Sequence, residues 1–196
     1  MAQVPEKYVG REQTLVKHLF LTKYLRKAAF MVFQGRSNTF NFVDAFAGPW
    51  SLADNTDFTD SSFDQAIRTL DPVRDHLEQR GVTGRRLRFR FCEKKPDRCA
   101  QLRDYAQRQS DYDIKVYEGV FEDHADEIAD DCRLGFTFTF IDPTGFKLRS
   151  ADIARFLAKT RSEFLLNFMA DHVNRSAGWE GVNEAYGGLL DDPKWR

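Results

Sequence analysis

Hydrophobic and polar positions along the chain fall into alternating blocks that are typical of an α/β protein. Short runs rich in aromatic and β-branched residues have the composition of buried strands, and the longer segments between them carry apolar residues at helical spacing. The strand-like runs lie at 40–43, 87–93, 113–117, 136–141 and 164–169. This order predicts one α/β domain over residues 1–196, with a mostly parallel, twisted sheet flanked by helices.

The N-terminal segment, residues 1–36, predicts one long amphipathic helix from about residue 11 to about residue 33. Leu21, Leu25 and Ala28 recur on one of its faces. Lysines and an arginine occupy the other faces, which favours a solvated surface there. The helix should end at Gly35.

Residues 51–86, between the first two strands, are more than a minimal crossover needs. They predict a helical insertion over or beside the strand ends. Ser61 or Ser62 can cap a first helix, and Asp71-Pro72 can begin a second.

The last strand-like run, 164–169, is nearly all apolar and predicts a strand buried on both faces, in which Asn167 needs a polar partner.

The second strand-like run alternates with a period of two, which separates its phenylalanines from its arginines. Together with the residues just before it, this run holds the densest basic cluster in the chain. The cluster consists of Arg85, Arg86, Arg88 and Arg90. It can meet nucleic-acid phosphates, or it can form a solvated strand face.

Composition narrows the classes of partner and compartment. The 29 basic and 30 acidic side chains give a formal net charge of −1, so no overall field attracts a nucleic acid, and any such partner must use a local patch. Cys92, Cys99 and Cys132 lack CxxC spacing and indicate neither a disulfide framework nor a metal site. Without a signal-like or membrane-spanning stretch, we expect a cytoplasmic protein with no membrane contact.

Acids follow three of the strand-like runs: Asp44, Glu93 and Asp142. The carboxyl ends of parallel strands meet at one edge of a sheet, where open α/β sheets bind ligands. Asp44 and the nearby Gly48 are therefore candidate binding residues, because a glycine lets backbone amides approach a ligand. Glu93 has an alternative interpretation, as a surface carboxylate that caps the helix beginning near Pro96.

The segment 44–50, Asp-Ala-Phe-Ala-Gly-Pro-Trp, resembles the first motif of Rossmann-like S-adenosylmethionine-dependent methyltransferases in its Asp-x-Phe-x-Gly form. Further motifs lie before and after it in a matching order. They are Lys17-His18, Phe91-Cys-Glu93, Phe140-Ile-Asp-Pro-Thr-Gly-Phe146, Asn167-Phe-Met169 and Arg175. Together they resemble the bacterial three-Cys-motif partner proteins (TcmP) and, more distantly, the ribosomal RNA adenine-N6 methyltransferases.

The resemblance implies a Rossmann-like methyltransferase fold, incomplete at its C-terminus, that uses S-adenosylmethionine to methylate an amine of a nucleic-acid base in RNA or DNA. It implies that the cofactor contacts Asp44, Phe46, Ala47, Gly48, Glu93 and Phe121. The catalytic residues it implies are Asp142, Pro143 and Phe146, in a motif similar to the Asp-Pro-Pro-Tyr of amino-methyltransferases. Those it places beside the substrate are Lys17, His18 and Arg175.

Simpler interpretations stand beside these. Phe121 can be a core residue, His18 a partly buried histidine, and Arg175 a salt-bridge partner. A second function hypothesis is a non-catalytic S-adenosylmethionine-binding or accessory module with a protein partner, because Thr144-Gly145 replaces the second proline of the motif and shifts its aromatic residue. A magnesium-dependent nucleotide hydrolase is disfavoured, because the chain has no G-x-x-x-x-G-K-[ST] loop.

Overall fold

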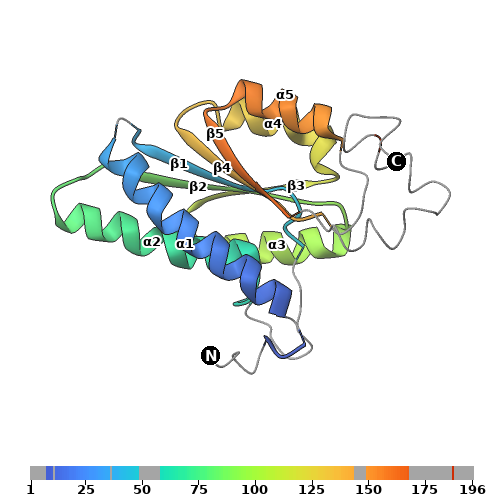
Figure 1. Cartoon of the computed structure of the whole chain (residues 1–196), viewed down its shortest axis with the longest axis horizontal. Helices are drawn as coiled ribbons and strands as arrows, with labels where there is room; N and C mark the ends of the chain where they lie inside the picture. The colour runs from blue at the N-terminus through green and yellow to red at the C-terminus, as the bar shows by residue number, and fades with distance from the viewer. Residues whose placement is uncertain are drawn as a thin grey trace.

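The computed structural model describes residues 8–10, 12–35, 37–48, 58–143, 149–167 and 187. Helices and strands alternate along this part of the chain (Figure 1). They are α1 (Glu12–Gln34), β1 (Thr39–Asp44), α2 (Ser62–Gln79), β2 (Arg86–Glu93), α3 (Pro96–Arg108), β3 (Asp113–Glu118), α4 (Phe121–Asp131), β4 (Phe136–Ile141), α5 (Ser150–Lys159) and β5 (Ser162–Leu166). No helix in these ranges is long and apolar enough to cross a membrane.

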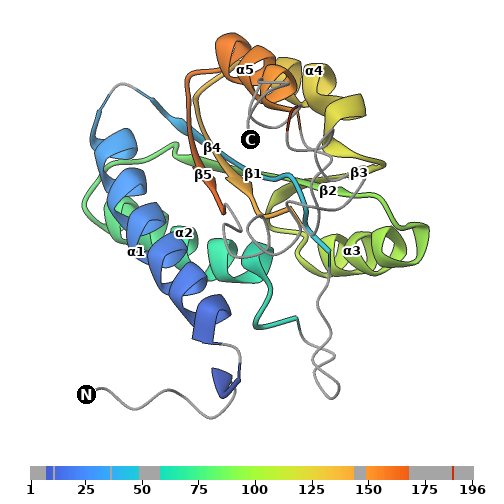
Figure 2. The same cartoon turned by 45° about the vertical axis from the view of Figure 1, so that its right-hand side comes forward.

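Every pair of neighbouring strands in the sheet is parallel, and the strand order is β3-β2-β1-β4-β5. The chain starts in the centre with β1, moves outward to β3, and returns to the other side of β1 with β4. Helices α1, α2 and α3 cover one face of the sheet, and α4 and α5 cover the other (Figures 1 and 2). The predicted α/β fold with a parallel sheet between helices is confirmed, and it is consistent with a Rossmann-like fold.

Aromatic side chains fill the core beneath α1, α2 and α3. Phe42, Phe89 and Phe138 come from three neighbouring strands and are all buried. The ring centroids of Phe63 in α2 and Phe91 in β2 lie 5.3 Å apart. Each such ring contributes about 1.5–3 kcal/mol by leaving water, which explains why the strands are so rich in phenylalanine. The same strands turn smaller side chains toward α4 and α5: Val43, Ala45, Cys92 and Ile141.

The helical predictions are confirmed in part. Helix α1 buries Leu21 and Leu25 as expected. Between β1 and β2, however, the described residues form one helix, α2, and not the two that Asp71-Pro72 suggested. Ser61 is its N-cap and accepts a hydrogen bond from the backbone of Asp64. The helix continues through Pro72 because its apolar stripe is buried on both sides of the proline, which outweighs one missing backbone bond.

Strand β5 differs from its prediction in its environment. It pairs with β4 on one side and forms an edge of the sheet within the described residues. It is not buried on both faces, because Phe164 is 47% exposed and Glu163 is also exposed. The end of the expected strand, residues 168–169, lies outside the described residues.

Two of the four arginines in the expected basic cluster of Arg85, Arg86, Arg88 and Arg90 are bound by acids. Arg90 is only 1% exposed and binds the carboxylates of Asp113 and Asp131. Arg88 binds the same two acids, with Nε 2.7 Å from Asp113 and Nη2 3.0 Å from Asp131. Arg85 donates to the Asn38 side chain. These acids come from β3 and α4. Arg88 and Arg90 therefore tie the sheet to α4 and are neutralised there, whereas Arg86 is exposed at the start of β2.

Replacing Arg90 with alanine should lower the free energy of unfolding by about 3 kcal/mol, because two acids lose a buried partner. Arg90→Met keeps most of the side-chain volume and should cost less. Urea denaturation of the three proteins at neutral pH measures both losses.

The same ion pairs predict acid sensitivity. Burial raises the pKa of Asp131, but Arg90 and Arg88 lower it by more, so it ends below its usual value. The contribution of the ionised Asp131 to the free energy of unfolding is present above the unfolded-state pKa of about 3.9. It is lost as the pH falls through the lowered folded-state pKa. Arg90→Met should therefore lose less stability than the wild type on acidification. Equal losses would show that the pairing contributes nothing.

Candidate functional site

The three acids predicted to end strands lie at one edge of the sheet. Asp44 pairs in register with Phe91 of β2 on one side and with Phe140 of β4 on the other. Glu93 and Asp142 each follow these partners by two residues. The acids therefore project from neighbouring strands at the carboxyl edge, beside the point where the chain reverses its winding direction.

The loop after β1 is fixed to both neighbouring strands. The Ala45 N–H donates to the Phe140 carbonyl (3.0 Å), and the Ala47 N–H donates to the Cys92 carbonyl (2.9 Å). A further bond, from the Gly48 N–H to the Phe46 carbonyl (2.8 Å), closes a tight turn. The loop thus has a defined shape before any ligand binds.

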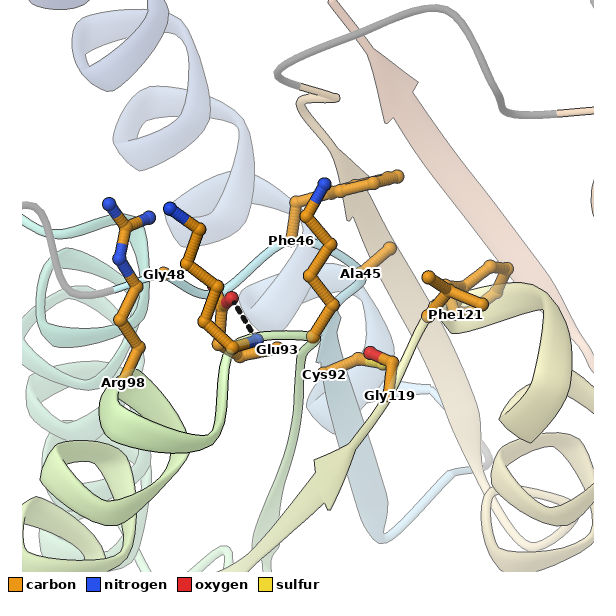
Figure 3. Close-up of a pocket in the computed structure, with 11 residues that line it drawn as sticks. Ala45, Phe46, Gly48, Cys92, Glu93, Arg98, Gly119 and Phe121 are labelled. Atoms are coloured by element: carbon orange, nitrogen blue, oxygen red, sulfur yellow. Dashed lines mark hydrogen bonds between the residues drawn. The ribbon is translucent and has the colours of Figure 1, made fainter.

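This loop forms one wall of a pocket of about 280 Å³ (Figure 3). The other walls come from the end of β2 with the start of α3, and from the turn between β3 and α4. The lining residues are Ala45, Phe46, Gly48, Cys92, Glu93, Lys94, Lys95, Arg98, Gly119, Val120 and Phe121. The pocket lies over the tips of β1, β2 and β3, and Asp142, at the tip of β4, is not among the residues that line it.

Glu93 lines this pocket although it is only 7% exposed. Its Oε1 accepts a hydrogen bond from the Lys95 N–H at 2.8 Å (Figure 3). A Cβ at position 48 would lie 2.6 Å from Glu93 Oε2. Any residue other than glycine would therefore push the carboxylate out of its place. The alternative interpretation of Glu93 as a surface carboxylate that caps α3 is wrong, because the side chain is buried and the N-cap of α3, Lys95, has no side-chain cap. The carboxylate faces the pocket.

Asp44 is the most deeply buried of the three acids, at 1% exposure. Its Oδ1 accepts from the Phe46 N–H (3.1 Å), and its Oδ2 accepts from the Ser62 hydroxyl. Burial, together with the charges of Asp142 and Glu93, raises the pKa of Asp44 to about 7 against the two hydrogen bonds that lower it. Near neutral pH this carboxyl group is therefore partly protonated.

Asp142 is held by two side chains from distant parts of the chain. The Lys17 Nζ donates to its Oδ2 at 2.6 Å, and the Asn167 Nδ2 donates to its Oδ1 at 2.7 Å. Asn167 is itself fixed by a bond from its N–H to the Ile141 carbonyl (2.9 Å). Asp142 is thus the polar partner that Asn167 was expected to need. Lys17, predicted to lie beside a substrate, is bound to a candidate catalytic acid in this structure.

The other predicted site residues lie in different environments. His18 is buried, with its Nδ1 3.1 Å from the Tyr8 hydroxyl oxygen, and it does not line the pocket. Phe121 packs on Phe156 with ring centroids 5.3 Å apart, so it is a core residue that also borders the pocket. Ala47 and Pro143 are buried. Phe146 and Arg175 lie outside the described residues.

Two contributors to the site were missed in the sequence. Ser62 was considered only as a helix cap, but Ser61 is the cap and Ser62 binds Asp44. The sequence did hold a signal for this role: one serine suffices to cap the helix, so the second was free to bind another residue. Lys94 and Lys95 follow Glu93 directly and line the pocket. The sequence pattern indicated a basic cluster only at the arginines before and within β2.

Comparisons with known proteins do not identify the chain. No model of a known protein family matches it, and no curated protein matches it at a significant level.

The buried carboxyl group of Asp44 predicts a pH-dependent stability. The folded-state pKa of Asp44 is raised. The contribution of Asp44 to the free energy of unfolding is therefore fully present below the unfolded-state pKa, about 3.9, and is lost as the pH rises through about 7. The loss should reach about 4 kcal/mol in the wild type and be absent in Asp44→Asn. Urea denaturation across this pH range measures it, and parallel curves for the two proteins would contradict it. Ser62→Ala removes a bond that lowers the pKa and should extend the loss to higher pH.

Proposed function

We propose that the protein is an S-adenosylmethionine-dependent methyltransferase that acts on an amine of a nucleic-acid base. The observation that carries the proposal is the pocket over the tips of β1, β2 and β3, with Glu93 in its wall and Asp44 beneath its loop. A carboxylate at the tip of the second strand of such a sheet suits the hydroxyl groups of a ribose. The strand order, with its reversal at β1, supports this location.

The residues of the pocket fit an adenosyl group. Ala45, Gly48 and Gly119 add little bulk to the wall, so a flat ring and a sugar can approach the backbone. Glu93 is already oriented by the Lys95 N–H, which lowers the cost of ordering it around a ligand. When bound, S-adenosylmethionine would supply the methyl group, and the protein would supply the orientation of donor and acceptor.

Asp142 is the candidate for holding the acceptor amine. It ends β4, next to the strand that leads into the pocket loop, and its electrostatic effect reaches Asp44. A carboxylate that accepts a hydrogen bond from an amine can orient the amine lone pair for transfer. A base that reaches this position must first leave its stack, because the tips of the strands cannot enter a duplex.

A specific observation favours the alternative, a non-catalytic S-adenosylmethionine-binding or accessory module. Both oxygens of Asp142 already accept hydrogen bonds, from Lys17 and Asn167. An amine would have to share or displace one of these donors. If that exchange does not occur, the pocket binds the cofactor and no methyl group is transferred.

The cofactor assignment predicts that S-adenosylhomocysteine binds and that Glu93→Gln weakens the binding by about 1–3 kcal/mol, because the ligand hydroxyl groups lose a charged acceptor and one carboxylate oxygen becomes an NH2 donor. Gly48→Ala should also weaken it, since the new Cβ displaces the Glu93 carboxylate, while changing the melting temperature little. The matched control is Glu118→Gln, at the end of β3, whose carboxylate binds Arg103 and does not line the pocket. Calorimetric titration decides: no binding to the wild type, or equal losses in Glu93→Gln and Glu118→Gln, would reject the assignment.

The role of Asp142 predicts a separation of binding from turnover. Asp142→Asn should retain most of the affinity for S-adenosylhomocysteine and lose most of the transfer of labelled methyl groups to total RNA or DNA. Comparable losses in both would remove Asp142 from the acceptor side. Tight binding by the wild type without any labelled product would support the non-catalytic module.

A further inference from the structure

Basic side chains line the pocket where β2 ends and α3 begins. Lys94 and Lys95 follow Glu93 at the tip of β2. Arg98 lies in the first turn of α3 (Figure 3). Both lysines are exposed, and neither forms an ion pair within the described residues. The third wall of the pocket carries no charged side chain. It consists of Gly119, Val120 and Phe121.

This cationic side does not suit the proposed cofactor. S-adenosylmethionine carries a sulfonium and an ammonium group against one carboxylate, so a cluster of cations beside it is unfavourable. The cluster is also unusual for this chain, which is nearly neutral overall and uses Arg88 and Arg90 in buried ion pairs. Unpaired lysines at a pocket mouth favour an anionic partner that enters from outside.

We propose that Lys94 and Lys95 form a phosphate-binding rim that holds the backbone of a single-stranded nucleic acid beside the pocket. The inference rests on the proposed function, because it concerns the acceptor of that reaction. Lysines follow a flexible backbone as mobile point charges, without a fixed geometry. A single strand is favoured over a duplex because its bases are free to turn inward.

The position of the lysines gives this rim a direction. Phosphates are attracted toward Lys94 and Lys95, which line the pocket on one side only, so the strand should run along the β2–α3 side. Its bases then point toward the strand tips, where Asp142 lies. The rim thus replaces the patch that the sequence suggested at Arg85, Arg86, Arg88 and Arg90.

The test measures the affinity of the full chain for a short, labelled, single-stranded oligonucleotide of mixed sequence, made once as RNA and once as DNA. Fluorescence anisotropy gives this affinity over a range of salt concentrations, without cofactor. The double variant Lys94→Gln/Lys95→Gln should bind about 10-fold or more weakly at low salt. The plot of log affinity against log salt concentration should become shallower, with a slope smaller in magnitude by about 1.4, which is about 0.7 for each of two lost phosphate contacts. The control, Arg86→Gln/Arg133→Gln, removes two exposed cations at the amino ends of β2 and β4, the opposite edge of the sheet. It should bind as the wild type does.

Each outcome separates the two proposals. Equal losses in the rim variant and the control would show diffuse attraction, and they would overturn the rim, as would failure of the wild type to bind either oligonucleotide. Stronger loss with one nucleic acid identifies the sugar chemistry of the partner. If the rim variant alone loses affinity but S-adenosylhomocysteine does not bind the wild type, the phosphate-binding rim stands and the methyltransferase proposal fails. Thermal denaturation confirms that both variants are folded.

Discussion

Strand β1 pairs with β2 on one side and with β4 on the other, all three in the same direction, and the site depends on this shared direction. Parallel pairing aligns the carboxyl ends of the strands, so residues that end them converge whatever their distance in sequence. Asp44 comes level with Phe91 and Phe140, and the acids that follow these residues come to the same edge. The aromatic core beneath α1, α2 and α3 holds this register, because a slip by one residue would turn the buried rings of β1 and β2 toward the other face.

The three acids share an edge but not an environment. Asp44 is buried under the pocket loop, with a hydroxyl and a backbone N–H as its partners. Glu93 borders the pocket itself. Asp142 is bound by a lysine and an asparagine, outside the pocket wall. Their surroundings thus differ: one acid fixes the loop after β1, one faces the pocket, and one is held between two distant segments of the chain.

The strands, the parallel sheet and the acids at its edge could be predicted from the sequence, because strand composition and strand ends are local signals. Contacts between distant segments could not. The residues next to Arg90 in the sequence do not predict its ion pairs with Asp113 and Asp131. Likewise, the residues around Lys17 do not predict its ion pair with Asp142, which is 125 residues away. Pro72 misled for a related reason: burial of the whole apolar stripe of α2 outweighs a local preference to stop.

The side chains around the pocket all come from one continuous stretch, residues 45–121, whereas the contacts of Asp142 come from α1 and from the residue after β5. The side chains that line the pocket and those that hold Asp142 thus belong to separate segments of the chain. A substitution in α1 or at Asn167 can change the surroundings of Asp142 without replacing any side chain of the pocket wall.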